Sequence, residues 1–267
     1  MSANKVTVST LHKMKADGEK FAVLTAYDAT FASVVDECGV EVILVGDSLG
    51  MVIQGDETTL PVTVDDIVYH TRAVSRGSNN ALIMADMPFM SDATPELAVH
   101  NAGRLMQQGG AHMVKLEGGA SQVEVVKRLS ELGIPVCGHL GLQPQSVHKL
   151  GGYKVQGRGV DAAEEILSDA TRLVEAGADL LLLECVPSQL AAEVTRSVTV
   201  PVIGIGAGPD TDAQVLVLYD MLGITPGKRP KFTHDFMQGS DSIQAAIQQY
   251  VKAVKEGSFP AAAHCFL

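Results

Sequence analysis

The apolar residues of this chain gather in short runs, separated by stretches in which apolar residues recur with helical spacing. The runs are apolar throughout rather than at every second position, which is typical of parallel strands covered by helices. They lie at residues 21–25, 42–45, 81–85, 113–116, 135–138, 180–183, 202–205 and 215–218. Eight such strands with helices between them predict a (β/α)8 TIM barrel, as a single domain over residues 1–267, with a doubly wound open sheet as the alternative.

Residues that start or end helices lie between the runs. Thr-Val-Asp-Asp at 63–66 and Ser-Gln-Val-Glu at 121–124 have the spacing of a capping box, and Thr94 precedes a proline. Glycines that follow periodic apolar stretches predict helix ends at Gly77, Gly109, Gly133 and Gly177. We expect the segment before residue 21 to form a short helix that caps the bottom of the barrel, and residues 240–256 to form a terminal helix.

One long stretch, residues 139–160, contains no acidic residue and no helical period. It holds several glycines and the basic side chains of His148, Lys149, Lys154 and Arg158. A structureless stretch of this length inside a compact domain is usually functional. We therefore expect it to meet an anion, with a surface excursion or a subunit contact as the alternative.

Composition and charge exclude several classes of function. The formal net charge of −11 disfavours binding to nucleic acid or to an anionic membrane. Aromatic residues make up 4% with no Trp, which argues against a stacking platform for single-stranded nucleic acid. The four cysteines form no CxxC pair, and no secretory signal or spanning segment is visible. These features predict a soluble, cytoplasmic enzyme with reduced cysteines.

Five consecutive apolar runs contain or are followed by polar side chains at their carboxyl ends. In a barrel of this type the catalytic residues lie at the carboxyl ends of the strands. We therefore expect the following candidates to meet at one rim: Asp47 and Ser48, Asp86, Lys115 and Glu117, His139, and Glu184.

Carboxylates that share a partly buried mouth need a compensating charge. A hard divalent cation such as Mg²⁺ provides it through oxygen ligands. Asp47 and Asp86 are the candidate direct ligands, and Glu117 is a third ligand or binds through water. The alternative for each aspartate is a helix N-cap.

The other candidates carry more than one interpretation. Lys115 shares a strand face with Glu117, and it could form a Schiff base, hold a substrate carboxylate or pair with an acid. Glu184 follows an apolar strand, which suits a base that abstracts a proton, or it is a hydrogen-bonded structural residue. His139 binds a substrate oxygen, orients a partner or bonds to backbone. The glycines of residues 204–208 form an anion-binding turn or a tightly packed one.

The chain resembles the ketopantoate hydroxymethyltransferase family in a series of motifs that occur in the same order. They are VGDSLGM at 45–51, ADMPF at 85–89, VKLEGG at 114–119, GHLGLQPQ at 138–145, GGYKVQGR at 151–158 and GIGAG at 204–208. The likeness extends from about residue 6 to residue 232. One departure is Thr-Asp-Ala-Gln at 211–214, where the family usually shows Cys-Asp-Gly-Gln.

The resemblance implies a (β/α)8 barrel that uses Mg²⁺ and commonly assembles as a homo-oligomer, a decamer. It implies formation of α-ketopantoate from α-ketoisovalerate with 5,10-methylenetetrahydrofolate as one-carbon donor, in the synthesis of pantothenate and coenzyme A. Carried onto this chain, Asp47, Asp86 and Glu117 bind the metal, and Glu184 accepts the proton. Asp47, Ser48, Asp86 and Lys115 contact the keto acid, and His139 is a further candidate.

Three other functions stay open at this point. A related barrel lyase or mutase would act on a 2-keto or phosphoenol acid without folate. A Schiff-base aldolase would be trapped on Lys115 by borohydride and would be insensitive to chelators. A non-catalytic metabolite-binding barrel would keep its function when Glu184 is replaced by Gln.

Overall fold

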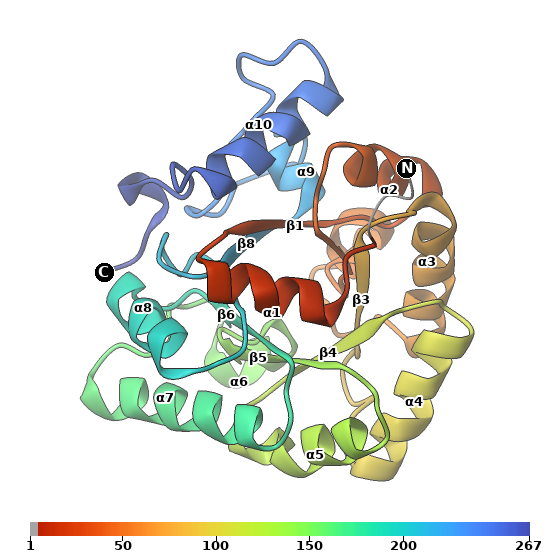
Figure 1. Cartoon of the computed structure of the whole chain (residues 1–267), viewed down its shortest axis with the longest axis vertical. Helices are drawn as coiled ribbons and strands as arrows, with labels where there is room; N and C mark the ends of the chain where they lie inside the picture. The colour runs from red at the N-terminus through yellow and green to blue at the C-terminus, as the bar shows by residue number, and fades with distance from the viewer. Residues whose placement is uncertain (1–4) are drawn as a thin grey trace.

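The structure, a computed structural model that describes residues 5–267, is a closed barrel of eight parallel strands (Figure 1). Each strand pairs with the next, and β8 pairs with β1, so the open-sheet alternative is wrong. The strands are β1 Phe21–Thr25, β2 Val42–Val45, β3 Leu82–Asp86, β4 Met113–Glu117, β5 Val136–Gly141, β6 Leu180–Glu184, β7 Val202–Ile205 and β8 Ala213–Leu216. The predicted TIM barrel is confirmed.

A ring of helices surrounds the barrel, and one further helix crosses its base (Figure 1). The helices are α1 Val8–Asp17, α2 Ala29–Glu37, α3 Val64–Gly77, α4 Pro95–Gln107, α5 Val123–Glu131, α6 Val147–Leu150, α7 Val160–Glu175, α8 Ser188–Ser197, α9 Leu218–Met221 and α10 Ile243–Lys255. The predicted terminal helix corresponds to α10. Within residues 5–267, no helix combines the length and the apolar character needed to cross a bilayer.

The eighth strand and its connection differ from the prediction. β8 begins at Ala213, opposite Phe21 of β1, two residues before the predicted run, and Leu218 already starts α9. The connection from β7 to β8, residues 206–212, contains no helix, although helices were expected between all strands. It packs so closely that a Cβ at Gly204 would lie 2.6 Å from Thr211 Oγ1.

The side chains that point into the barrel are apolar at its base and charged at its mouth. In β3, Leu82 and Met84 face the interior cluster, whereas Ile83 and Ala85 face the helices. Because the side-chain period is two, the next inward position is Asp86, at the carboxyl end. The same alternation carries β4 from an apolar Met113 to charged residues, so the barrel is apolar at its base and charged at its mouth.

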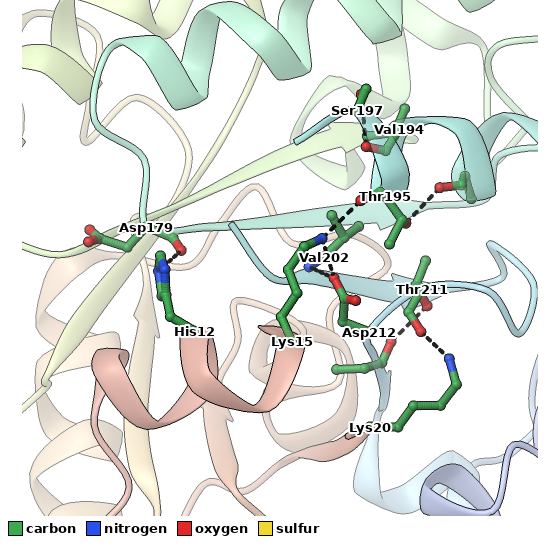
Figure 2. Close-up of polar contacts among 12 residues, drawn as sticks. His12, Lys15, Lys20, Asp179, Val194, Thr195, Ser197, Val202, Thr211 and Asp212 are labelled. Atoms are coloured by element: carbon green, nitrogen blue, oxygen red, sulfur yellow. Dashed lines mark hydrogen bonds and ion pairs between the residues drawn. The ribbon is translucent and has the colours of Figure 1, made fainter. Parts of the chain in front are cut away.

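Helix α1 closes the base of the barrel, as predicted, through side chains that reach the amino ends of late strands. Lys15 Nζ lies 2.8 Å from the carboxylate of Asp212, just before β8. The ring of His12 lies 2.9 Å from the carbonyl oxygen of Asp179, just before β6 (Figure 2). Leu11, which precedes His12 in α1, is fully buried in the interior cluster. The helix is therefore hydrogen-bonded to residues that come just before β6 and β8, more than 150 positions later in the chain.

Two of the predicted helix starts are confirmed and one is wrong. Thr63 forms its capping box with Asp66, and Thr94 caps α4 with Pro95 in the first turn. The expected capping box at Ser121 is absent, because a 3-10 turn, Ala120–Gln122, precedes α5 and Gln122 makes no side-chain cap. The helix stops at Gly133 and Gly177 have the expected positive φ, whereas Gly77 is the last residue of α3 and Gly109 has no positive φ.

The expectation of a structureless stretch over residues 139–160 is wrong for its first half. β5 continues to Gly141, a 3-10 turn covers Pro144–Ser146, and α6 follows. Elements of three or four residues leave no recognisable period in a sequence. Residues 151–159 are irregular, with a turn and bends at their start and several positive-φ glycines, so the expectation of a stretch without helix or strand holds there.

Candidate active site

All of the predicted site residues lie at the carboxyl ends of neighbouring strands. Asp47 and Ser48 follow β2, Asp86 ends β3, Lys115 and Glu117 end β4, His139 lies in β5 and Glu184 ends β6. Five consecutive strands thus contribute to one mouth.

Asp86 links its two neighbours in this cluster. Its Oδ2 accepts the backbone N–H of Asp47 at 2.9 Å, and its Oδ1 lies 2.9 Å from Lys115 Nζ. The side chains of Asp86 and Lys115 are only 3% and 5% exposed. Neither aspartate caps a helix here, and of the interpretations of Lys115 the ion pair is the one observed.

Burial and neighbouring negative charges disfavour the ionised form of Asp47. Desolvation raises its pKa well above the usual range, and Asp86 and Glu117 raise it further, while Lys115 opposes them. Burial alone would lower the pKa of Lys115, but the surrounding carboxylates outweigh burial and raise it. The cluster therefore keeps its lysine charged and favours the arrival of additional positive charge.

His139 lies between two carboxylates and bonds to side chains rather than to backbone. Its Nε2 is 3.2 Å from Glu184 Oε2, and its Nδ1 is 3.5 Å from Glu117 Oε1 and 3.3 Å from Lys115 Nζ. Burial and Lys115 lower the pKa of His139, but the two carboxylates outweigh them and raise it to about 9. His139 thus lies beside Glu184, whose side chain is 15% exposed.

Apolar side chains border the charged cluster inside the barrel. Leu44 of β2 and Ile205 of β7, which pairs with Glu184, belong to the interior cluster, and Phe232, from the segment between α9 and α10, packs against it. The charged mouth therefore lies directly beside hydrocarbon.

Analysis of the sequence missed Gln145 as a site residue. Its side-chain Nε2 donates to Asp47 Oδ2 at 2.8 Å and to the Met87 carbonyl at 3.0 Å, and its backbone N–H donates to Glu117 Oε2 at 3.1 Å. Tyr27 is a second unassigned contact, because its hydroxyl is hydrogen-bonded to Ser48 Oγ at 2.8 Å. The signal for Gln145 was present only in its position within a resembling motif.

Asp92, in the connection between β3 and α4, is a further acid that the sequence did not single out. It is 5% exposed, and burial raises its pKa to about 6. Because the pKa of Asp92 is raised in the folded protein, its ionised carboxylate lowers the free energy of unfolding above about pH 6. At low pH the carboxyl group is protonated in both the folded and the unfolded protein, and this loss of stability disappears.

Asp92→Asn is therefore expected to increase the free energy of unfolding at pH 7.5 by up to about 3 kcal/mol. The difference should shrink as the pH falls through 6 towards 4. Denaturant unfolding of both proteins at a series of pH values measures it, with the exposed Asp241→Asn as the matched control. Equal stability of Asp92→Asn and the parent at every pH would contradict the shift.

The glycine turn after β7 is closely packed rather than open to an anion. Gly206 has φ +60°, and a Cβ there would lie 2.9 Å from Phe232 and 3.1 Å from Phe266. The first backbone N–H of α8, at Ser188, donates to the Phe266 carbonyl at 3.0 Å. The close packing around Gly206 favours the packing alternative.

The departure at residues 211–214 lies away from the carboxylates. Thr211 Oγ1 donates to the Ala213 carbonyl, and Asp212 binds Lys15 of α1 at the base of the barrel. The two altered positions, Thr211 and Ala213, therefore flank the aspartate that bonds to α1 at the base of the barrel.

The donor set fits a cation that takes few protein ligands. Among residues 5–267, no three His, Cys, Asp or Glu side chains converge closely enough to form a complete metal cage. Mg²⁺ typically binds one or two carboxylates and completes its shell with water and substrate oxygens. Asp47 and Asp86, joined by a hydrogen bond and rich in negative charge, match that requirement.

Comparison with known proteins gives a family and a fold. The family model described as ketopantoate hydroxymethyltransferase matches residues 5–262. The chain is 62% identical to a 3-methyl-2-oxobutanoate hydroxymethyltransferase of Alkalilimnicola ehrlichii, covering 98% of this chain and 94% of the relative. It is 60% identical to a 3-methyl-2-oxobutanoate hydroxymethyltransferase 2 of Hahella chejuensis, covering 98% of both.

Solved structures of low sequence identity share the fold. A 2,3-dimethylmalate lyase of the PEP mutase/isocitrate lyase superfamily has a TM-score of 0.56 at 15% identity, over 81% of this chain and 79% of that one. A phosphonopyruvate hydrolase in complex with oxalate and Mg²⁺ has a TM-score of 0.60 at 11% identity, over 96% of this chain and 92% of that one. At these identities the likeness shows the barrel alone.

Proposed function

The chain belongs to the ketopantoate hydroxymethyltransferase family and is an enzyme of that family, and on this premise we propose that it uses 5,10-methylenetetrahydrofolate to convert α-ketoisovalerate into α-ketopantoate. The product would enter the synthesis of pantothenate and coenzyme A. The observation that carries the proposal is the meeting of Asp47, Asp86, Lys115 and Glu184 at one mouth, beside the apolar interior of the barrel.

The charged side of the mouth suits a 2-keto acid. Lys115, held by Asp86, offers a cation to the substrate carboxylate, and Ser48 offers a hydroxyl beside it. Mg²⁺, held by Asp47 and Asp86 with Glu117 as a further ligand, would supply Lewis-acid stabilisation of negative charge on the keto oxygen. The ion pair at Lys115 argues against the Schiff-base alternative, which requires a neutral amine.

Glu184 is placed to act as the base. Its Oε2 lies 3.2 Å from His139 Nε2, and among the described residues its Oε1 forms no hydrogen bond. In the proposed step Glu184 takes the proton from the branched carbon beside the ketone. That carbon then forms a bond to the folate methylene carbon, and both carbon–nitrogen bonds of the methylene bridge break. Water provides the hydroxyl group, and tetrahydrofolate leaves with its two nitrogens protonated, one proton coming from water and the other being the proton taken up by Glu184.

The hydrocarbon beside the charged cluster suits the branched alkyl group of the keto acid. Leu44, Ile205 and Phe232 belong to or pack against the apolar interior cluster next to the charged residues. A substrate that binds by its carboxylate to Lys115 could place its alkyl group against these side chains. We also propose that the basic segment from His148 to Arg158 closes over the mouth and keeps bulk water away. Retention of full turnover after deletion of residues 151–157 would contradict this closure.

The deciding experiment is formation of α-ketopantoate from α-ketoisovalerate with and without the folate donor, and with and without EDTA. We expect product only when the folate and a divalent cation are both present, and recovery when Mg²⁺ is restored in excess. Borohydride should trap no substrate on Lys115. Folate-independent cleavage of a carbon–carbon bond would favour the lyase alternative, and chelator-insensitive activity would contradict the metal. The expected decamer and cytoplasmic location stay predictions, and measurement of native mass tests the first.

A further inference from the structure

We propose that Gln145 is a positioning residue that couples the carboxylates Asp47 and Glu117 to the segment 143–155, so that loading of the cation site and ordering of this segment are linked. The inference rests on the cation of the proposed function. It concerns a residue outside the charged and nucleophilic side chains that carry the chemistry.

Gln145 is bonded to two carboxylates from different strands. Its side-chain amide donates to Asp47 Oδ2 at 2.8 Å, and its backbone N–H donates to Glu117 Oε2 at 3.1 Å. A third bond, to the Met87 carbonyl at 3.0 Å, fixes the amide plane. Both carboxylates are at least nine-tenths buried, so their orientation depends on the few donors that reach them.

These bonds leave one oxygen of Asp47 available. Among the described residues, Oδ1 of Asp47 forms no hydrogen bond, whereas Oδ2 is taken by Gln145. Carboxylates that bind metal are commonly held by a hydrogen bond on the other oxygen, which sets their orientation and tunes affinity. Gln145 therefore presents Oδ1 of Asp47 to a cation without competing for it.

The same residue holds the segment to the barrel. Within residues 143–155, the hydrogen bonds that reach the rest of the described chain are those of Gln145, one contact of Tyr153 with a sulfur, Met51 Sδ at 3.7 Å, and the bond that the Lys154 carbonyl accepts from the side chain of neighbouring Gln156. The remaining bonds of residues 143–155 are local, such as those from Ser146 to Gln143 and from Gly152 to Val147.

The ends of the segment are fixed independently of Gln145. The Leu142 N–H donates to the Glu184 carbonyl at 2.8 Å, and the Gln156 N–H donates to the Cys185 carbonyl at 2.9 Å. The part between them depends on Gln145 for its strong polar contacts. A cation that fixes Asp47 and Glu117 would therefore also fix Gln145 and, through it, the 3-10 turn and α6.

The test uses the full chain with MgCl₂ alone, without keto acid or folate. Isothermal titration gives cation affinity, and hydrogen–deuterium exchange gives protection of peptides within 143–155. In the parent protein, Mg²⁺ should slow exchange in this segment. In Gln145→Ala, affinity should fall by about 10- to 100-fold. At saturating Mg²⁺ the slowing of exchange should be lost.

Gln143→Ala is the matched control, because Gln143 lies in the same connection and, among residues 5–267, its side chain forms one hydrogen bond, accepted from Ser146 Oγ at 3.5 Å. It should behave as the parent in both measurements. Gln145→Asn, which keeps the amide on a shorter side chain, should give an intermediate affinity and serves if the alanine variant does not fold. Far-UV circular dichroism reports the fold of each variant.

The outcomes separate this inference from the proposed function. A parent protein that binds no Mg²⁺ would overturn the cation and the inference together. Binding of Mg²⁺ by the parent with no change of exchange in 143–155 would overturn the coupling alone. A Gln145→Ala protein that keeps both the Mg²⁺ affinity of the parent and its slowed exchange in 143–155 would also overturn the coupling alone.

Discussion

Replacement of Glu184 by Gln is expected to lower turnover by about 10²- to 10⁴-fold, the usual contribution of a positioned general base. The substitution keeps the size of the side chain and a hydrogen-bonding group near His139 Nε2, which lies 3.2 Å from Glu184 in the parent. It removes the basic oxygen that would take the proton. Mg²⁺ affinity should change little, because Glu184 is not among the carboxylates that would hold the cation.

Proton abstraction can be measured apart from folate chemistry. In D₂O, the parent with Mg²⁺ should exchange the hydrogen on the branched carbon of α-ketoisovalerate, as followed by proton NMR, and Glu184→Gln should not. Glu193→Gln, on the exposed face of α8, is the matched control and should exchange as the parent does. Undiminished exchange in Glu184→Gln would show that another group removes the proton.

Replacement of Lys115 by Met should destabilise the protein by about 3 to 5 kcal/mol, the range seen when one partner of a buried ion pair is removed. Asp86 Oδ1 would lose its partner at 2.9 Å, while Asp47 and Glu117 would still add negative charge around it. The methionine fills a similar volume, so the loss is electrostatic rather than a cavity. Turnover should also fall, because the cation offered to the substrate carboxylate is gone.

A double-mutant cycle separates the charge from other effects of the substitution. Lys115→Met with Asp86→Asn should be more stable than Lys115→Met alone, because no uncompensated charge is left on Asp86. Lys127→Met, at an exposed position of α5, is the matched control and should leave unfolding by denaturant nearly unchanged. A Lys115→Met protein as stable as the parent would contradict the compensating role of this lysine.

The inward charged residues could be predicted because strand periodicity and strand ends are local properties. Asp86 follows an apolar run directly, and Lys115 and Glu117 are two positions apart, so their shared face follows from the chain alone. The carboxyl ends of parallel strands meet at one rim whatever the details of the loops between them. This is why the whole charged cluster was anticipated before its geometry was known.

The missed features depend on contacts between distant parts of the chain. Gln145 contacts Asp47 across 98 positions, and nothing around Gln145 marks it as a ligand to a carboxylate. The predicted start of β8 was late because its first residues include Gln214, a polar side chain buried by bonds to Thr211 and the Gly208 carbonyl. Polar residues that satisfy each other inside a protein interrupt the apolar runs on which strand prediction relies.

The bonds of α1 to residues near β6 and β8 also constrain how a newly made chain can fold. Asp212, the partner of Lys15, leaves the ribosome long after α1 has been made. The strand β8, which pairs with β1, is also synthesised long after β1. Until then β1 keeps an unpaired edge, which can pair with another nascent chain. During synthesis, therefore, the vulnerable period for aggregation lasts until about four-fifths of the polypeptide has emerged, and chaperone assistance would matter most in that interval.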